Sequence, residues 1–205
     1  AIVGRNGVGK TTLLRALAGL QKYSGKTKVI SAEYDQNPDF GMVFQNPDLQ
    51  LFNPSVREEL LYRLPDADLA YYAELIALLG LESYENTPPL LLSEGEKKRV
   101  ALGLVLMRQP KHGVLLDEPS LGQDCVHKDT LIHILRALAN SGQLVIITTH
   151  DLTLAKQADS LILLGDDGVI ADGKPKLVFD DTSAWARAGL HLPDWFQRER
   201  GQDAH

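Results

Sequence analysis

The sequence has few of the features that stabilise secreted or membrane-spanning proteins. Cys125 is its only cysteine, which rules out a disulfide within the chain and favours a reducing compartment. No apolar run approaches the ~20 residues that a helix needs to cross a bilayer, and the longest, residues 100–107, stops at Arg108. Positive charge is also scarce, since 21 lysines and arginines face 27 acidic residues and leave a net charge of −6. That balance disfavours a broad nucleic-acid-binding surface.

The chain does contain the material for an α/β domain, because 205 residues that are 44% hydrophobic can bury a substantial core. Residues 114–116 and 144–147 are apolar runs typical of buried parallel strands, and residues 128–139 between them have helical spacing. This strand–helix–strand order predicts a right-handed crossover. Residues 161–170 predict a terminal hairpin.

The middle of the chain differs from the rest because its patterns are helical. Helices are expected over residues 56–62 and 68–79, and a pair of prolines at Pro88 and Pro89 then breaks the pattern. The sequence therefore predicts an α/β fold with a mostly parallel sheet flanked by helices, plus an inserted helical subdomain. We assign residues 1–45 and 108–175 to the α/β core, 46–107 to the helical subdomain and 176–205 to a C-terminal tail.

A glycine-rich segment near the start fits the pattern G-x-x-x-x-G-K-[ST] of a phosphate-binding loop. A strand end at residues 1–3 precedes it and a helix over residues 12–18 follows. The glycines let backbone N–H groups approach phosphate oxygens, the lysine adds positive charge, and the first threonine offers a hydroxyl to Mg²⁺. These features disfavour the alternative of an ordinary glycine turn. The predicted nucleotide-binding residues are Gly4, Arg5, Asn6, Gly7, Val8, Gly9, Lys10, Thr11 and Thr12.

Chemically active side chains follow two of the predicted strands. Asp117 and Glu118 close the strand at residues 114–116, and His150 follows the strand at residues 144–147. Open parallel sheets bind ligands at such carboxyl ends. Asp117 is therefore placed to hold Mg²⁺, Glu118 to deprotonate an attacking water, and His150 to contact a γ-phosphate. The alternatives are a solvated acidic turn and a structural histidine.

A helix start is predicted at Ser93, because Glu96 three residues later completes a capping box. The capping box does not explain the cations Lys97, Lys98 and Arg99 in the first helical turn, which oppose the helix dipole. They indicate a nearby anion, and a solvated basic face is the alternative.

Taken in order, these motifs resemble the nucleotide-binding subunit of ATP-binding-cassette (ABC) transporters, and the resemblance covers nearly the whole chain. It implies a P-loop NTPase that hydrolyses ATP with Mg²⁺. The matches are Walker A at residues 4–12, the Q-loop at Gln45, the signature at residues 92–96, Walker B at residues 114–118, the D-loop at residues 120–124 and the switch histidine at His150.

The resemblance also implies that two cassettes sandwich two ATP molecules. Ser93 and Gly95 would bind the γ-phosphate of the ATP held by the opposing subunit, and Gln45 would touch both Mg²⁺ and the attacking water. The residues implied for catalysis are Lys10, Gln45, Glu118 and His150; for Mg²⁺, Thr11, Gln45 and Asp117; and for the signature and D-loop, Ser93, Glu94, Gly95, Glu96 and Asp124.

Within that family, residues 43–52 look like the Q-loop of energy-coupling-factor (ECF) importers, which carry vitamins or transition-metal ions. Residues 96–99 and 188–190 also resemble that group, and residues 120–124 resemble the second cassette of tandem ECF ATPases. The resemblance implies a peripheral ATPase on the cytoplasmic face of the cell membrane. Its partners would be a transmembrane subunit docked near the Q-loop, a second cassette (identical, paralogous or fused) and a separate substrate-binding membrane subunit, with no nucleic acid.

Three departures from the family pattern stand out. Glu94 occupies a signature position that is usually glycine, and we expect its side chain to point away from phosphate. Gln123 replaces a usual leucine of the D-loop. Because the chain begins at Ala1 inside a predicted strand, we expect an N-terminal truncation that removes the adenine-stacking aromatic residue.

Other functions remain as alternatives. A soluble ABC ATPase could act on ribosomes or DNA, but the spacing from Gln45 to Ser93 leaves no room for the long coiled coil of repair-type members, and translation-type members lack this Q-loop. A small-molecule kinase could use the same phosphate loop, yet it would need neither the signature nor His150. The chain could also be the ATPase of another ABC transporter class.

The segment after the Q-loop glutamine predicts a docking surface. Leu49, Leu51 and Phe52 are apolar in a stretch otherwise polar enough to be exposed, and its two prolines keep it out of regular helix. We expect these side chains and Asp48 to line a groove that receives a helix of the transmembrane subunit. The alternative is that the apolar residues fold back onto the helical subdomain.

Overall fold

The computed structural model describes residues 1–22, 24, 39–122, 124–192 and 196. The chain divides into two compact units, which we call the terminal unit (Ala1–Lys10 with Thr148–His205) and the central unit (Thr11–Ile147). The division falls between Lys10 and Thr11, so each unit carries part of the predicted phosphate loop. Gln123, which the sequence singled out in the D-loop, lies outside the described residues.

The strands of the central unit follow the order β2 (Phe40–Val43), β3 (Gly113–Asp117) and β4 (Leu144–Thr148), with β2 parallel to β3. They are almost wholly apolar, as strands covered on both faces require. Gly41 is needed where α4 (Glu94–Met107) crosses β2, because a Cβ there would overlap the Val105 side chain. The helix therefore packs directly on the edge of the sheet.

The strands of the terminal unit continue the same pattern. Thr148, at the end of β4, pairs in parallel with Ile2 of β1 (Ile2–Gly4), and β1 pairs in parallel with β5 (Leu161–Gly165). β5 then forms an antiparallel hairpin with β6 (Gly168–Gly173). The predictions of a mostly parallel sheet and a terminal hairpin are confirmed, and the six strands found among the described residues follow the order β2-β3-β4-β1-β5-β6.

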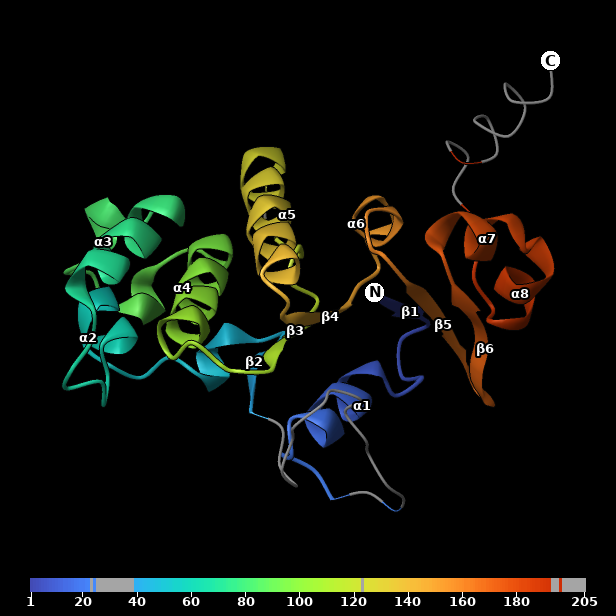
Figure 1. Ribbon diagram of the computed structural model, residues 1–205, viewed down its shortest axis with the longest axis horizontal. Coiled ribbons are helices and arrows are strands. Elements are labelled where there is room, and N and C mark those ends of the chain that lie inside the picture. Colours follow the sequence, from blue (N-terminus) through green and yellow to red (C-terminus); the bar gives the residue numbers. More distant parts are fainter. Residues whose placement is uncertain (23, 25–38, 123, 193–195, 197–205) are drawn as a thin grey trace. The chain divides into compact units, whose positions relative to one another are not determined.

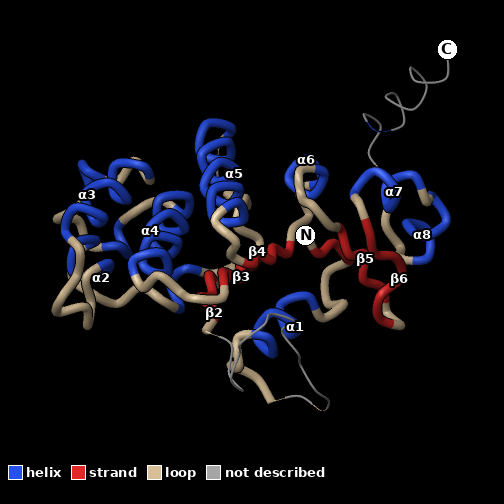
Figure 2. Tube along the Cα trace, in the orientation of Figure 1, coloured by secondary structure: helices blue, strands red, loops and turns tan. Residues whose placement is uncertain are grey.

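Three helices of the central unit correspond to the helical patterns expected in the middle of the chain. They are α2 (Val56–Leu60), α3 (Leu69–Leu78) and α4, which lie together in Figures 1 and 2. Gly103 of α4 has no room for a side chain, because a Cβ would sit 2.9 Å from the Leu79 methyl group. Short 3₁₀ turns connect these helices: η1 (Pro47–Leu49), η2 (Glu82–Tyr84) and η3 (Pro89–Leu91).

Two further helices follow functional segments in the sequence: one follows the phosphate loop, and the other follows β3 and the D-loop. α1 (Lys10–Leu17) begins inside the loop, and its Leu14 is buried with Met42 and Leu115 of the central sheet. α5 (Cys125–Asn140) connects β3 to β4, as the strand–helix–strand pattern predicts. The helix that follows the loop is thereby anchored through Leu14 in the core of the central unit.

The terminal unit has its own core beneath short helices. α6 (Leu152–Lys156) follows β4, while α7 (Pro175–Asp180) and α8 (Thr182–Arg187) lie against β5 and β6 (Figure 1). The rings of Phe179 and Trp185 stack with their centroids 5.1 Å apart, and the Trp185 indole donates to a backbone carbonyl. The segment expected as a tail therefore contributes both helices and core to this unit.

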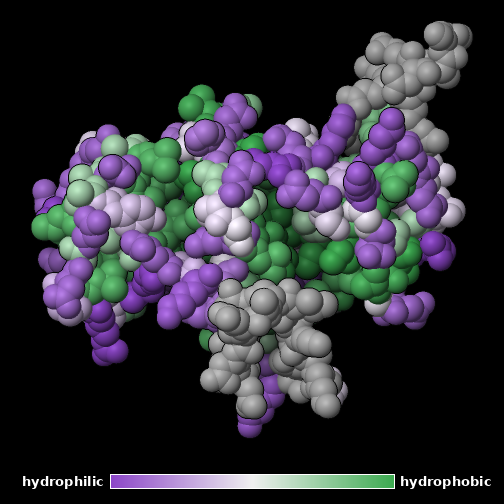
Figure 3. Space-filling view, viewed as in Figure 1, coloured by the Kyte–Doolittle hydropathy of each residue, from purple (hydrophilic) through white to green (hydrophobic). Residues whose placement is uncertain are grey.

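Within the described part of the chain, no helix is both long and apolar enough to cross a bilayer. On the face shown in Figure 3, hydrophilic and hydrophobic side chains are intermixed over α2, α3 and α4.

Candidate nucleotide site

The terminal unit holds the first part of the phosphate loop around the Lys10 ammonium. Lys10 Nζ donates to the backbone carbonyls of Gly4, at 2.7 Å, and Arg5, at 3.1 Å. Gly7 and Gly9 have φ values of 82° and 102°, which residues with a side chain rarely adopt. The loop thus curls around its own lysine and concentrates positive charge at the end of β1.

His150 lies beside that lysine. Its Nε2 is 3.2 Å from Lys10 Nζ, and because an ammonium can only donate, Nε2 is the acceptor in this contact. The backbone on either side is fixed: Asp151 N donates to the Thr149 hydroxyl, and the Asp151 carboxylate caps α6. The structure therefore places the predicted switch histidine next to the phosphate-loop lysine.

In the central unit, the loop threonine contacts the end of the neighbouring strand. Thr11 Oγ1 donates to Asp117 Oδ2 at 2.7 Å, and Asp117 is only 2% exposed. A hydroxyl and a buried carboxylate are oxygen ligands that suit Mg²⁺. No group of three His, Cys, Asp or Glu side chains gathers as a metal site in the described ranges. A Mg²⁺ ion here would accordingly take its other ligands from phosphate and water, as Mg²⁺ commonly does.

Glu118 stands in an unusual backbone conformation immediately after β3. Its φ is 50°, in the left-handed region, and its side chain is buried. The Glu118 carbonyl accepts two hydrogen bonds, from Leu121 N at 3.3 Å and from Lys98 Nζ at 2.9 Å. Non-glycine residues held in this region cluster at functional sites.

The signature residues form the predicted capping box at the start of α4. Ser93 Oγ accepts from Glu96 N, and Glu96 Oε2 accepts from both the backbone N–H and the hydroxyl of Ser93. Hydrogen bonds from the Tyr84 hydroxyl and then from Ser93 lower the pKa of Glu96. Within the subunit, Glu96 therefore caps the N-terminus of α4.

Both remaining signature positions touch the D-loop. A Cβ on Gly95 would sit 3.0 Å from the Gly122 carbonyl, and the Glu94 side chain lies within van der Waals reach of a Cβ placed on Gly122. Asp124, at the end of the D-loop, is the N-cap of α5 and accepts from His127 N. The expectation that Glu94 points away from phosphate stays a prediction.

The idea that the three cations after the signature form a solvated basic face is wrong. Lys97 pairs with the Asp48 carboxylate at 2.8 Å, while Lys98 and Arg99 are buried. Burial lowers the pKa of Lys98, and the charges of nearby carboxylates oppose that change. The anion that the helix dipole argument called for is, at Lys97, a side chain of this protein.

Gln45 is exposed just beyond β2, and a residue that the sequence analysis missed supports the loop behind it. The Gln50 amide accepts from Phe44 N and donates to the Met42 carbonyl, both at 2.8 Å. The Gln50 side chain thus makes, with the backbone at the end of β2, the hydrogen bonds that a neighbouring strand would otherwise make. Nothing in the spacing of the motif distinguishes this glutamine from a surface residue.

The predicted docking surface needs one correction. Leu51 is 3% exposed and belongs to the core, whereas Leu49 and Phe52 are each 64% exposed. The buried carboxylate of Glu59, which the sequence analysis also missed, accepts from the N–H groups of Phe52 and Asn53. Leu51 is therefore buried, as the fold-back alternative expects, while Leu49 and Phe52 stay exposed. The Phe52 ring nevertheless packs edge-on against Tyr62 of the helical subdomain.

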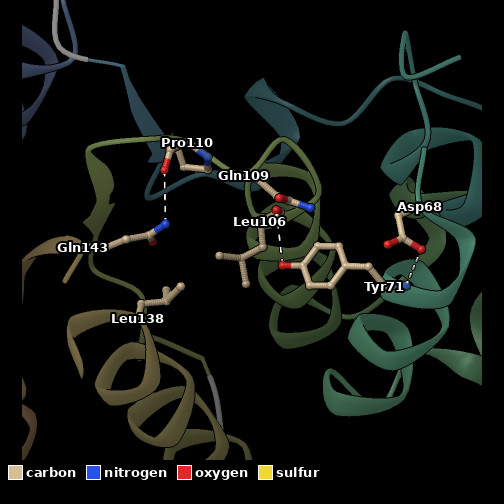
Figure 4. A pocket seen from close by; sticks show the side chains of 7 residues that line it. All are labelled: Asp68, Tyr71, Leu106, Gln109, Pro110, Leu138 and Gln143. Carbon is tan, nitrogen blue, oxygen red and sulfur yellow. Dashed lines mark hydrogen bonds between the residues drawn. The ribbon is translucent and has the colours of Figure 1, made fainter. Parts of the chain in front are cut away.

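A cavity of about 300 Å³ lies elsewhere in the central unit, and Figure 4 labels the side chains that line it. The Tyr71 hydroxyl donates to the Leu106 carbonyl, and the Gln143 amide donates to the Pro110 carbonyl. None of the predicted site residues lines this cavity. The first of these hydrogen bonds joins α3 to α4, and the second joins the segments that follow α4 and α5.

Comparison with known proteins identifies the family. The family described as ABC transporter matches residues 1–121. This chain belongs to the ABC transporter ATPases. As an ABC ATPase it is an ATP-binding and ATP-hydrolysing domain, and the alternative of a small-molecule kinase is wrong.

Among the relatives of this ABC ATPase are ATP-binding proteins of energy-coupling factor transporters. It is 38% identical to the energy-coupling factor transporter ATP-binding protein EcfA of Methanothermobacter thermautotrophicus, over 94% of this chain and 67% of the relative. It is 34% identical to EcfA1 of Ligilactobacillus salivarius, over 94% of this chain and 73% of the relative. The structure of cbiO1 from Clostridium perfringens, part of the ABC transporter complex cbiONQ, superposes with a TM-score of 0.72 at 30% identity, covering 97% of this chain and 86% of that one.

Proposed function

We propose that this ABC ATPase is the energising subunit of an ECF-type importer of vitamins or transition-metal ions. The observation that carries the chemistry is the 2.7 Å contact between Thr11 of the phosphate loop and Asp117 at the end of β3, which creates an oxygen-rich position for Mg²⁺. The names of the relatives support the ECF assignment.

The proposed reaction is in-line attack of water on the γ-phosphate of ATP. Lys10 neutralises charge on the phosphates. Thr11 and Asp117 would hold Mg²⁺, with Gln45 on the side of the water, and a bound ion would supply further positive charge for the charge that develops. Glu118 takes the proton of the attacking water. His150, whose Nε2 contacts Lys10, orients the γ-phosphate.

The proposed assembly places this chain at the cytoplasmic face of the membrane. A second cassette, identical, paralogous or fused, would offer its signature to the ATP bound here, while Ser93 and Gly95 serve the partner's ATP. A transmembrane subunit would dock on the exposed Leu49 and Phe52 beside Asp48. A separate membrane subunit would choose the solute.

Glu118→Gln tests this function in the complete transporter, reconstituted in vesicles with its membrane partners. The amide cannot accept the proton, so we expect ATP binding to persist while hydrolysis and solute uptake fall by about 10²–10³-fold. Fluorescent-nucleotide binding, phosphate release and uptake of labelled solute measure the three steps. Parental hydrolysis by this variant would refute the base assignment. Hydrolysis without coupled uptake by the unaltered protein would refute the importer.

A further inference from the structure

Lys98 is a cation of the signature helix that reaches the segment carrying the proposed base. Lys97, Lys98 and Arg99 follow one another on α4, where successive residues point about 100° apart. Lys97 turns toward Asp48 on the surface, while Lys98 is 3% exposed and donates to the Glu118 carbonyl at 2.9 Å. The contact joins residues that are 20 positions apart in the sequence.

The accepting carbonyl belongs to a residue whose backbone needs support. Glu118 has a φ of 50°, and a side chain in this left-handed region is unfavourable unless surrounding contacts hold it there. The turn hydrogen bond from Leu121 N, at 3.3 Å, is long, whereas the bond from the Lys98 ammonium is short and charge-assisted. Of these two hydrogen bonds to the Glu118 carbonyl, the one from Lys98 is therefore the stronger.

Burial lowers the pKa of Lys98, and nearby carboxylates oppose part of that change. Glu94 lies four residues earlier on α4, the orientation in which a glutamate and a lysine stabilise a helix, and Asp117 and Glu118 add negative charge. Glu94 is the residue that departs from the usual glycine of the signature. Its carboxylate thus has a role in this subunit that does not require it to face phosphate.

We propose that Lys98 is a positioning residue for catalysis, which holds the Glu118 backbone in the conformation that presents the carboxylate to the attacking water. The inference rests on the proposed role of Glu118 as the base. Because Lys98 is part of α4, it also links the helix that carries the signature to the base of the same subunit. The Gly95–Gly122 contact, where a Cβ would meet a carbonyl at 3.0 Å, packs the start of that helix on the same segment.

The test is Lys98→Met in the complete transporter, with ATP hydrolysis measured over a range of ATP concentrations. Loss of the charged hydrogen bond is expected to lower kcat about ten-fold. KM for ATP and the Kd for a fluorescent nucleotide should change less than about two-fold, because the hydrogen bond of Lys98 is to the Glu118 carbonyl and not to the phosphate loop. Lys98→Arg, which keeps a cationic donor, should recover most of the lost kcat.

Arg108→Met is the matched control. Arg108 ends the same helix and donates to a backbone carbonyl, that of Tyr62, at 3.0 Å, but it lies on the surface. Its loss should leave kcat within about two-fold of the parent. If Lys98→Met does not accumulate in cells, Lys98→Gln is used in its place, because the glutamine side chain is too short to reach the Glu118 carbonyl.

Two results would overturn the proposal. One is an unchanged kcat for Lys98→Met, and the other is a fall in kcat that Lys98→Arg does not relieve or that comes with an equal loss of nucleotide binding. The Glu118→Gln variant separates this proposal from the one on which it rests. If Glu118→Gln is inactive and Lys98→Met is fully active, only the proposed role of Lys98 is refuted. If Glu118→Gln is active, the assignment of Glu118 as the base is refuted.

Discussion

The terminal and central units hold their functional side chains in different ways. In the terminal unit the phosphate loop supplies its own contacts, since Lys10 is held by the carbonyls of Gly4 and Arg5 within the same motif. In the central unit the important contacts join distant segments, as between Lys98 and the Glu118 carbonyl. Residues that a motif positions by itself are recognisable from the sequence, whereas residues positioned from elsewhere are not.

Replacing Glu59 should have the largest effect, because its buried carboxylate joins α2 to the loop that precedes it. Glu59→Ala leaves the N–H groups of Phe52 and Asn53, and the Asn53 amide, without their buried acceptor. We expect the free energy of unfolding in urea to fall by about 3 kcal/mol. Glu58→Ala, an exposed neighbour on α2, is the control and should cost less than about 0.5 kcal/mol. Equal losses from the two variants would contradict the role of this carboxylate.

The same loop predicts opposite behaviour for two leucines separated by one residue. Leu51→Ala should lower the free energy of unfolding by about 2–4 kcal/mol, because Leu51 is core. Leu49→Ala should leave stability unchanged within about 0.5 kcal/mol, yet weaken co-purification with the transmembrane subunit, because Leu49 is exposed. Undiminished co-purification would remove Leu49 from the docking surface, and a stable Leu51→Ala would contradict the orientation of the loop.

A local contact in the terminal unit should matter least. Asp151 caps α6 through the N–H groups of Thr153 and Leu154, only two and three residues away. Asp151→Ala should cost about 1 kcal/mol in thermal or urea unfolding, the usual value for an N-cap. Asp151→Asn, which can still accept, should recover most of it. A loss as large as that from Glu59→Ala would show that a helix cap in the terminal unit and the buried acceptor in the central unit do not differ in this way.

Sequence reasoning succeeded where a short stretch contains both partners of an interaction. The capping box of Ser93 and Glu96 is present because both residues lie in one helical turn. Leu51 was misplaced because its burial depends on the packing of the fold rather than on the residues beside it. Gln50 was missed because its amide acts on the end of β2, a contact without any pattern in the chain.

The sequence by itself determined the family, the order of the motifs and the elements that carry them, because glycine geometry, capping and apolar periodicity act over a few residues. Only the tertiary structure decided how the cations after the signature are used. Lys97 pairs on the surface while Lys98 is buried against the Glu118 carbonyl. The reason is that burial and hydrogen-bond partners depend on which segments pack together. α4 contacts the residues after β3 because the two segments pack against each other in the folded protein, although they are distant in the sequence.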